Sequence, residues 1–293
     1  MAMREMMHLF TGLIVVVVAV VVLVLGPGDP FDRGFDLLAV GQVEGAIASF
    51  SRVSEMHPLY PYARLYLAQG YLEAGEPGRA VSVLAGVGIP FEVDLLLGRA
   101  HLALGNLALA EAKAAEALHA AILSEERAAA LSLTLELAET RADHVQQVES
   151  ILQLLEVLPV RFIGYEARAL RTRLAEAAVF LDPADDRDRQ ALFDYAIYLA
   201  RVDPAGARRI LLAVLPFLTG TDKHEAEFQI ALITSTRLGD RRSAEGLFEG
   251  LIARGPQEMR DRSRYFAAHN LIALGRRAEA KEGFARIIER GNA

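Results

Sequence analysis

The sequence has no cysteine and no tryptophan among its 293 residues. Without cysteine the chain cannot form a disulfide, a thiolate zinc site, an iron–sulfur cluster or a cysteine-linked lipid anchor. Charged residues make up only 24% of the chain and hydrophobic residues 53%, a balance that disfavours intrinsic disorder. A net charge of −7 and a pI near 5.6 disfavour a general nucleic-acid binder. The length fits one or two folded domains.

Alanine is the most conspicuous component, with 48 residues in the chain. Alanine has the highest helix propensity, and its small side chain lets neighbouring helices approach closely. The composition therefore predicts a mainly helical protein.

One long uncharged run lies near the start, the 17 residues Leu9–Leu25 (LFTGLIVVVVAVVVLVL), followed by Gly-Pro-Gly-Asp-Pro over 26–30. A helix of this length is roughly 26 Å long, the lower end of what crosses a bilayer. We predict a short tail over 1–8, a transmembrane signal-anchor helix over 9–25 and a Gly/Pro hinge over 26–30. A cleaved signal peptide and a buried core helix are the alternatives, but no Ala-x-Ala-like cleavage site follows the valine run.

The sequence indicates the orientation of this anchor less strongly than it indicates the anchor itself. Lys and Arg nearly tie between its two flanks, with Arg4 before it and Arg33 after it. The large body after a short tail fits a signal-anchor whose N-terminus stays inside the cell. We therefore expect the body on the outer side of the cytoplasmic (inner) membrane, which is the periplasm if the source is bacterial.

A glycine followed five residues later by an alanine recurs in the remaining chain. An apolar or small residue comes seven positions after each alanine. This spacing fits two antiparallel helices that meet across a glycine turn, with the alanine at their contact. A single helix pair cannot bury its apolar face, so several pairs must stack. The five occurrences are Gly41/Ala46, Gly75/Ala80, Gly105/Ala110, Gly239/Ala244 and Gly275/Ala280.

With its 34-residue step between the first two units, the pattern resembles the tetratricopeptide repeat (TPR) family. The resemblance implies an all-α fold, a right-handed α-solenoid of TPR-like antiparallel helix pairs preceded by one transmembrane helix. We place N-terminal repeats over 31–120, degenerate helical repeats over 121–218 and C-terminal repeats over 219–293. Gln147 stands where the small residue belongs, and the tryptophan that is frequent in the family is absent.

No catalytic constellation is visible, and we predict neither an enzyme nor a metal or cofactor site. The seven histidines show no zinc-ligand spacing, and the nucleophile-elbow and phosphate-loop patterns are absent. His101 falls at a helix-packing position, where a buried histidine with satisfied hydrogen bonds is expected. The acidic run over 182–189 indicates a solvated loop that begins a helix. A divalent-ion site there is the alternative, although its spacing matches no calcium loop.

In the TPR family, partners are usually bound on the concave face, which is lined by the first helix of each pair. The chaperone-tail clamp of some members is not present, because Phe31 and Phe35 stand at the corresponding positions of the first unit. The resemblance implies a partner-binding face made of Tyr62, Leu65, Gln69, Leu72, Glu92, Leu95, Arg99, Leu102, Gln229, Ile233, Thr236, Arg237, Arg262, Tyr265, His269 and Ile272.

Charge is distributed unevenly. The segment from Arg237 to the end has 12 Lys and Arg against 8 Asp and Glu, a local net charge of +4. Such a surface would attract an acidic segment of a partner, and a solvated outer face is the alternative.

These features together predict a non-enzymatic, membrane-tethered scaffold for protein–protein interaction. Its role would be that of an assembly factor or accessory subunit of a bacterial envelope or inner-membrane complex. The expected partners are proteins, among them other membrane subunits or an acidic segment, and the bilayer through 9–25, but no nucleic acid. Two alternatives remain: a structural subunit whose membrane helix packs in a larger complex, and a helical accessory body of a cell-wall enzyme.

Overall fold

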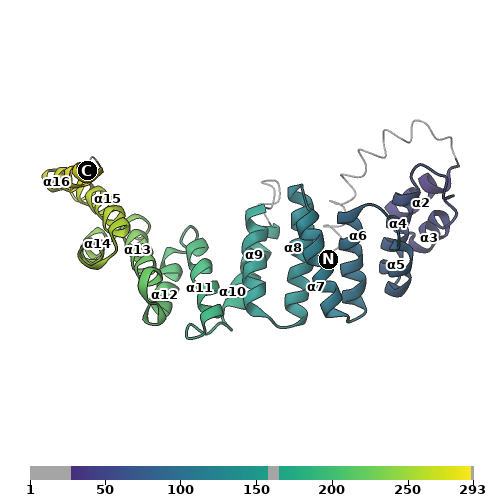
Figure 1. Ribbon diagram of the computed structural model, residues 1–293, viewed down its shortest axis with the longest axis horizontal. Coiled ribbons are helices and arrows are strands. Elements are labelled where there is room, and N and C mark those ends of the chain that lie inside the picture. The colour runs from purple at the N-terminus through teal and green to yellow at the C-terminus, as the bar shows by residue number, and fades with distance from the viewer. Residues whose placement is uncertain (1–27, 158–164, 292–293) are drawn as a thin grey trace. The chain divides into compact units, whose positions relative to one another are not determined.

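The computed structural model describes residues 28–157 and 165–291. Fifteen α-helices and one short 3-10 turn account for the regular structure, and these two ranges contain no strand (Figure 1). The predicted all-α class is confirmed. The chain divides into two compact units, Met1–Thr172 and Arg173–Ala293, and the division falls inside α10 (Tyr165–Ala178), within the segment for which degenerate repeats are predicted.

Unit 1 is built from four helix pairs. Three residues join the helices of each pair, and the two helices pack along each other, so they run antiparallel. The first helices of successive pairs also touch, α4 on α6 and α6 on α8, which produces the predicted stacking. The helices are α2 (Pro30–Ala39), α3 (Val43–Phe50), α4 (Tyr60–Glu73), α5 (Pro77–Leu84), α6 (Pro90–Ala103), α7 (Leu107–Ala120), α8 (Ser124–Thr140) and α9 (His144–Val157).

Unit 2 contains three further pairs. Within it α12 packs on α13 and α14 on α15, and the first helices α13 and α15 also touch. The pairs are α11 (Asp186–Leu199) with α12 (Pro204–Val214), α13 (Gly220–Thr236) with α14 (Arg241–Arg254), and α15 (Gln257–Ala273) with α16 (Arg277–Gly291); a 3-10 turn, Leu215–Phe217, follows α12.

The predicted glycine turns are confirmed. The five turn glycines have φ between +72° and +82°, a left-handed conformation that a Cβ atom disfavours. In the fourth pair Ala142 takes this conformation instead, with φ of +54°. The alanine that faces across the turn is buried in each of the first three pairs, with at most 1% exposure at Ala46, Ala80 and Ala110.

Gln147 departs from the small-residue rule without breaking the helix contact. Its side-chain amide Nε2 donates a hydrogen bond to the carbonyl oxygen of Ala138, at 3.2 Å, across the turn of the fourth pair. The same carbonyl oxygen accepts from the backbone N–H of Asp143 at 2.9 Å, so the glutamine amide adds a second hydrogen bond to it. The long side chain therefore replaces an alanine contact by a polar one.

An aromatic cluster forms the core at the start of unit 1. The Phe31 ring centroid lies 5.8 Å from that of Phe50 and 6.0 Å from that of Tyr66, both in edge-to-face geometry. Phe31 is fully buried, and Phe35 contacts Tyr66 from the neighbouring turn of α2. Burial raises the pKa of the Tyr66 hydroxyl, which has no hydrogen-bond partner.

The predicted membrane span over 9–25 lies outside the described residues. No helix within 28–157 or 165–291 combines the length and the apolar character needed to cross a bilayer.

Candidate partner-binding surface

Three of the sixteen predicted partner-binding residues point into the core instead of out of it. Leu65, Leu95 and Ile233 are only 4%, 1% and 2% exposed. They hold their helices against the neighbouring pair and cannot contact a partner directly, which corrects their assignment to a surface. The pattern misled because a first helix in such a stack packs against helices on several sides, so few of its positions remain exposed.

The other candidates of unit 1 form a half-buried layer on the first helices. They are Tyr62, Gln69 and Leu72 on α4, and Glu92, Arg99 and Leu102 on α6. Because α4, α6 and α8 touch in succession, the residues of α4 and α6 belong to one continuous surface.

Two charged groups in this layer are partly desolvated. Burial raises the pKa of the Glu92 carboxyl, and the nearby Glu126 carboxylate adds to the effect. Burial lowers the pKa of the Arg99 guanidinium, against the opposing effect of Glu136 on α8. Both shifts mean that removal of water disfavours the charged form, and a complementary group from a partner would counter that cost.

In unit 2, Arg262 is already engaged within the protein. Its Nη1 and Nη2 lie 2.8 and 3.3 Å from the two carboxylate oxygens of Glu225, and its guanidinium lies 4.3 Å from the ring centroid of Phe228. This contact joins α15 to α13. Arg262 therefore stabilises the packing of two first helices, and it is a weaker candidate for an acidic partner than its sequence position suggests.

Tyr265 and His269, two candidates for the partner-binding face, form a ring cluster with a third residue, Phe284. Their ring centroids lie 4.5 Å apart, and those of His269 and Phe284 lie 5.3 Å apart. Phe284 belongs to α16, so the cluster joins the two helices of the last pair, α15 and α16. The remaining candidates of unit 2 lie along α13 and α15, or at the C-terminal end of α13: Gln229 is half-buried, whereas Thr236, Arg237 and Ile272 are exposed.

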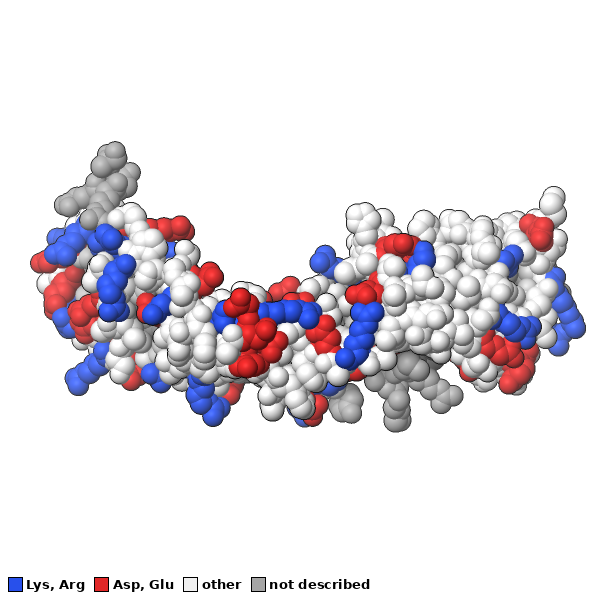
Figure 2. All heavy atoms as spheres, turned by 60° about the horizontal axis from the view of Figure 1, so that its bottom comes forward, with Lys and Arg blue, Asp and Glu red and all other residues white. Residues whose placement is uncertain are grey.

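The basic character of the C-terminal segment does not produce a surface of one sign. Arg264 pairs with Asp261 at 2.7 Å, and Arg276 pairs with Glu279 and Glu245, which raise the pKa of its guanidinium. On the face shown in Figure 2, unit 2 carries blue and red side chains interspersed, whereas unit 1 shows a broad area with few charges. Three of the twelve cations of this segment, Arg262, Arg264 and Arg276, are thus paired with carboxylates of the chain itself, and Arg237 is exposed.

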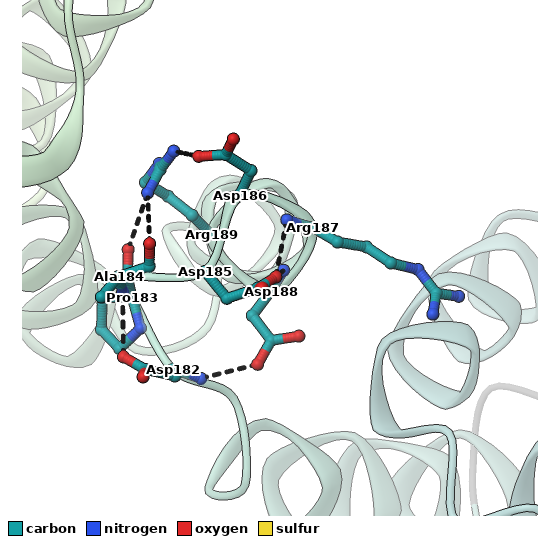
Figure 3. Close-up of polar contacts among 8 residues, drawn as sticks. All are labelled: Asp182, Pro183, Ala184, Asp185, Asp186, Arg187, Asp188 and Arg189. Atoms are coloured by element: carbon teal, nitrogen blue, oxygen red, sulfur yellow. Dashed lines mark hydrogen bonds and ion pairs between the residues drawn. The ribbon is translucent and has the colours of Figure 1, made fainter.

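The acidic run over 182–189 forms the loop and cap that its sequence predicts (Figure 3). Asp185 Oδ1 accepts hydrogen bonds from the backbone N–H groups of Arg187 and Asp188, at 2.9 and 3.1 Å, and so caps α11. Asp188 Oδ2 accepts from the backbone N–H of Asp182 at 2.8 Å, and Asp186 pairs with Arg189. The carboxylates point in different directions, and no group of three or more potential metal ligands occurs within the described ranges.

Sequence reasoning missed two polar connections. His57, one of the histidines without a predicted role, lies 2.9 Å from Asp29. Asn270 is buried on α15, where its Oδ1 accepts from Ser235 Oγ and its Nδ2 donates to the carbonyl oxygen of Arg241, both at 2.7 Å. His101 differs from expectation in the opposite sense, because its Nδ1 is buried with no hydrogen-bond partner.

Comparison with known proteins gives structural matches alone. A crystal structure of a tetratricopeptide repeat protein from Parabacteroides merdae is 14% identical, with 89% of this chain and 91% of that chain covered and a TM-score of 0.37. The crystal structure of the P58(IPK) TPR domain is 20% identical, with 89% and 72% covered and a TM-score of 0.33. No protein-family model matches, and neither does any curated protein.

The character of the fold is therefore established by the chain's own helix pairs. Left-handed turn residues, buried alanines across the turn and contacts between successive first helices recur along the chain. Each unit is a stack of TPR-like antiparallel helix pairs.

Proposed function

We propose that this chain is a non-enzymatic, membrane-tethered scaffold that holds a protein partner on the first-helix layer of unit 1. The observation that carries the proposal is the unbroken contact of α4, α6 and α8 beneath the half-buried side chains of Tyr62, Gln69, Glu92 and Arg99. A TPR-like stack is a general interaction module, and the sequence has neither the nucleophile-elbow pattern nor the phosphate-loop pattern.

The polar groups of this layer give the partner a definite chemistry. Glu92 and Arg99 carry opposite charges on one helix, seven residues apart, so they lie on the same side about two turns from each other. A partner segment with a basic and an acidic group at a matching distance would recover charge-assisted hydrogen bonds for both. Half-buried Tyr62 and Leu102 add apolar contact beside them.

The uncharged run over 9–25 is the observation that supports the proposed membrane tether. A membrane anchor confines the body and its partner to one surface, which raises their effective concentration and lets weak contacts suffice. We place the body on the outer side of the cytoplasmic membrane, as an assembly factor or accessory subunit of an envelope complex. A reporter fused to the C-terminus tests the side, and a cytoplasmic signal would overturn this orientation.

Affinity purification from gently solubilised membranes tests the scaffold role. Gln69→Arg places a long charged side chain on the first-helix layer, and Ser82→Arg places the same side chain on the exposed side of α5 as a matched control. Proteins that co-purify with the native chain and with Ser82→Arg should be lost with Gln69→Arg. Equal recovery with both variants would contradict the proposed site.

The runner-up role, a structural subunit that binds through its membrane helix, is separated by a deletion of residues 1–28. Retention of the co-purifying proteins after the deletion supports the repeat body as the binding element. Their loss, with the body still folded by circular dichroism, supports the membrane helix instead.

A further inference from the structure

The helix pairs of unit 1 are connected by loops at two opposite edges. The chain enters unit 1 from the predicted anchor at one of them, which we call the anchor-side edge. Because the pairs are antiparallel, every first helix begins at this edge and every second helix ends there (Figure 1). The anchor-side edge therefore consists of the start of α2 at Asp29 and the three loops 51–59, 85–89 and 121–123. The glycine turns lie at the opposite edge.

The anchor-side edge exposes large apolar side chains. Met56 is 92% exposed and Ile122 is 91% exposed, the highest values for large hydrophobic side chains in the ranges 28–157 and 165–291. Leu123, next to Ile122, is 38% exposed. A single exposed apolar residue is ordinary, but the two most exposed ones both lie in loops of the same edge.

Charged residues are few at both edges of unit 1. The loops 85–89 and 121–123 contain no charged residue, and 51–59 contains one Arg and one Glu. The opposite edge exposes Val40 and Leu104, at 70% and 45%, and its other two turns carry Glu76, Arg141 and Asp143. With Asp29 counted, each edge carries three charged residues, so the anchor-side edge differs from the opposite one in the exposure of Met56 and Ile122.

Tyr60 and Arg64 provide the kind of side chains that are found at the boundary between lipid and water. Arg64 Nη1 donates to the Tyr60 hydroxyl at 2.9 Å, and Arg64 Nε donates to the carbonyl oxygen of Val83 at 2.6 Å, where α5 ends. Both residues belong to the first turns of α4, which start at the anchor-side edge. Tyrosine is enriched at membrane interfaces, and arginine extends its charge toward the headgroups.

Chain length sets how far this edge lies from the bilayer. Four peptide steps separate Leu25 from Asp29, so the link reaches at most about 14 Å when fully extended. The headgroup layer on each side of the hydrocarbon is itself about 5–8 Å thick. Asp29 contacts His57, the neighbour of Met56, through an Oδ2–Nε2 distance of 2.9 Å. The chain therefore holds Met56 within reach of the headgroups.

We propose that the anchor-side edge of unit 1 rests on the lipid bilayer, with Met56 and Ile122 inserted at the level where headgroups meet acyl chains. This inference depends on the membrane anchor of the proposed function and goes beyond it, because it fixes the orientation of the body. With the loops on the membrane, the helices of unit 1 stand away from it and present the first-helix layer sideways to a membrane-bound partner.

The absence of native tryptophan permits a direct test in the full chain. Single-tryptophan variants at Met56 and Ile122, matched controls at Val40 and Leu104, and a reference at Val17 within the predicted span are reconstituted into phosphatidylcholine vesicles. The vesicles contain acyl-brominated or unbrominated lipid. Bromine quenches a tryptophan only when the indole lies in the lipid.

The proposal predicts quenching for the Met56→Trp and Ile122→Trp variants and for the Val17→Trp reference, with Val40→Trp and Leu104→Trp unquenched. Quenching of the reference alone would overturn the resting edge and leave the anchor intact. Loss of quenching at Val17 as well would overturn the anchor and the edge together. A blue shift at Met56 or Ile122 that grows with the protein-to-lipid ratio, without quenching, would show an edge buried between copies and would also overturn the proposal.

Discussion

Asp29 and His57 close the first helix pair by a contact between side chains 28 residues apart. Oδ2 of Asp29 lies 2.9 Å from Nε2 of His57, while Oδ1 of Asp29 accepts from the backbone N–H of Phe31 at 2.7 Å. His57 Nδ1 accepts from the backbone N–H of Leu59 at 3.1 Å, so the proton of the neutral imidazole lies on Nε2 and is donated to Asp29. One carboxylate thus caps α2 and fastens it to the loop before α4.

Asp29→Ala should destabilise the start of α2. It removes a helix N-cap, a loss of about 0.5–2 kcal/mol, and leaves His57 Nε2 without its acceptor. Hydrogen exchange at the Phe31 and Leu59 amides should accelerate, whereas amides of α13 and α14 should not change. Asp29→Asn keeps a capping oxygen and should recover most of the protection at Phe31. Unchanged exchange in Asp29→Ala would show that the contact contributes nothing.

Ala142→Gly should stabilise the protein. Ala142 has φ of +54°, in the position that glycine occupies in the other turns of this type. Relief of the left-handed strain outweighs the greater entropy of the unfolded glycine chain, for a net gain of about 0.5–1 kcal/mol. Gly105→Ala, with φ of +74°, should lose about 1 kcal/mol. Urea denaturation followed by circular dichroism measures both.

Gly78→Ala is the matched control for these turn variants. Gly78 lies in the first turn of α5 with open space around it, so an added methyl group should raise the urea midpoint slightly. If Gly105→Ala shifted the midpoint in the same direction as Gly78→Ala, the conformational explanation of the turns would be wrong.

Gly98→Ala should weaken the contact between α6 and α8. A Cβ atom at position 98 would lie 2.6 Å from Cδ2 of Leu133, a side chain that is 1% exposed and has little room to move. The overpacking should cost about 1–3 kcal/mol. Leu133→Val removes the clashing Cδ2 atom, so the double variant should lose less stability than the sum of the two single variants. Strict additivity in urea denaturation would contradict the proposed clash.

Asn270→Ala should loosen the connection between the last two pairs. It leaves the Ser235 hydroxyl and the Arg241 carbonyl without the partner they have in the buried contact, at about 1–3 kcal/mol. Thr236→Ala changes the exposed neighbour of Ser235 and should alter the free energy of unfolding by less than about 0.5 kcal/mol. Similar urea midpoints for the two variants would refute a role for the buried amide.

Glu92 should make stability fall as pH rises. Burial raises the pKa of its carboxyl in the folded state, so the folded chain binds this proton more tightly than the unfolded chain. The Glu92 contribution is therefore most favourable below the unfolded pKa near 4.5 and declines as pH rises through the folded pKa. Glu92→Gln should gain stability relative to the native chain across this window.

Glu116 gives a control of opposite sign for this pH dependence. Its hydrogen bond with Lys113 lowers the pKa of its carboxyl, so its contribution is present above the unfolded pKa and is lost as pH falls. The difference between Glu116→Gln and the native chain should therefore change with pH in the opposite direction. A Glu92→Gln difference that does not vary between pH 4 and pH 7 would contradict the burial of Glu92.

Much of the fold follows from spacing in the sequence. Gly41, Gly75 and Gly105 mark the turns because glycine alone takes φ near +75° without strain, and alanine five residues on fits the helix contact. The fourth turn lacks this signal, because Ala142 takes the left-handed conformation in place of a glycine. The 34-residue sequence pattern is therefore hard to recognise at the fourth pair, although the helix pair itself is present.

The site was harder to predict than the fold. A position on a helix indicates which side a residue faces, but not how much of that side the neighbouring pair covers. The sequence therefore predicts a surface position for Leu65 and Leu95, which are buried. Pairing at long range is also absent from local patterns. Arg262 pairs with Glu225, which lies 37 positions earlier in the sequence. The sequence alone shows only an excess of positive charge in the C-terminal segment.

The most direct test of the scaffold account is site-specific photo-crosslinking in native membranes from a benzoylphenylalanine at position 69. The same photoprobe at position 82, on the exposed side of α5, is the control. The account predicts a discrete crosslinked protein from position 69 that is missing from position 82 and disappears when Arg99→Ala is added. Crosslinks of equal pattern from both positions, or a discrete adduct from position 82 alone, would contradict partner binding on the first-helix layer of unit 1.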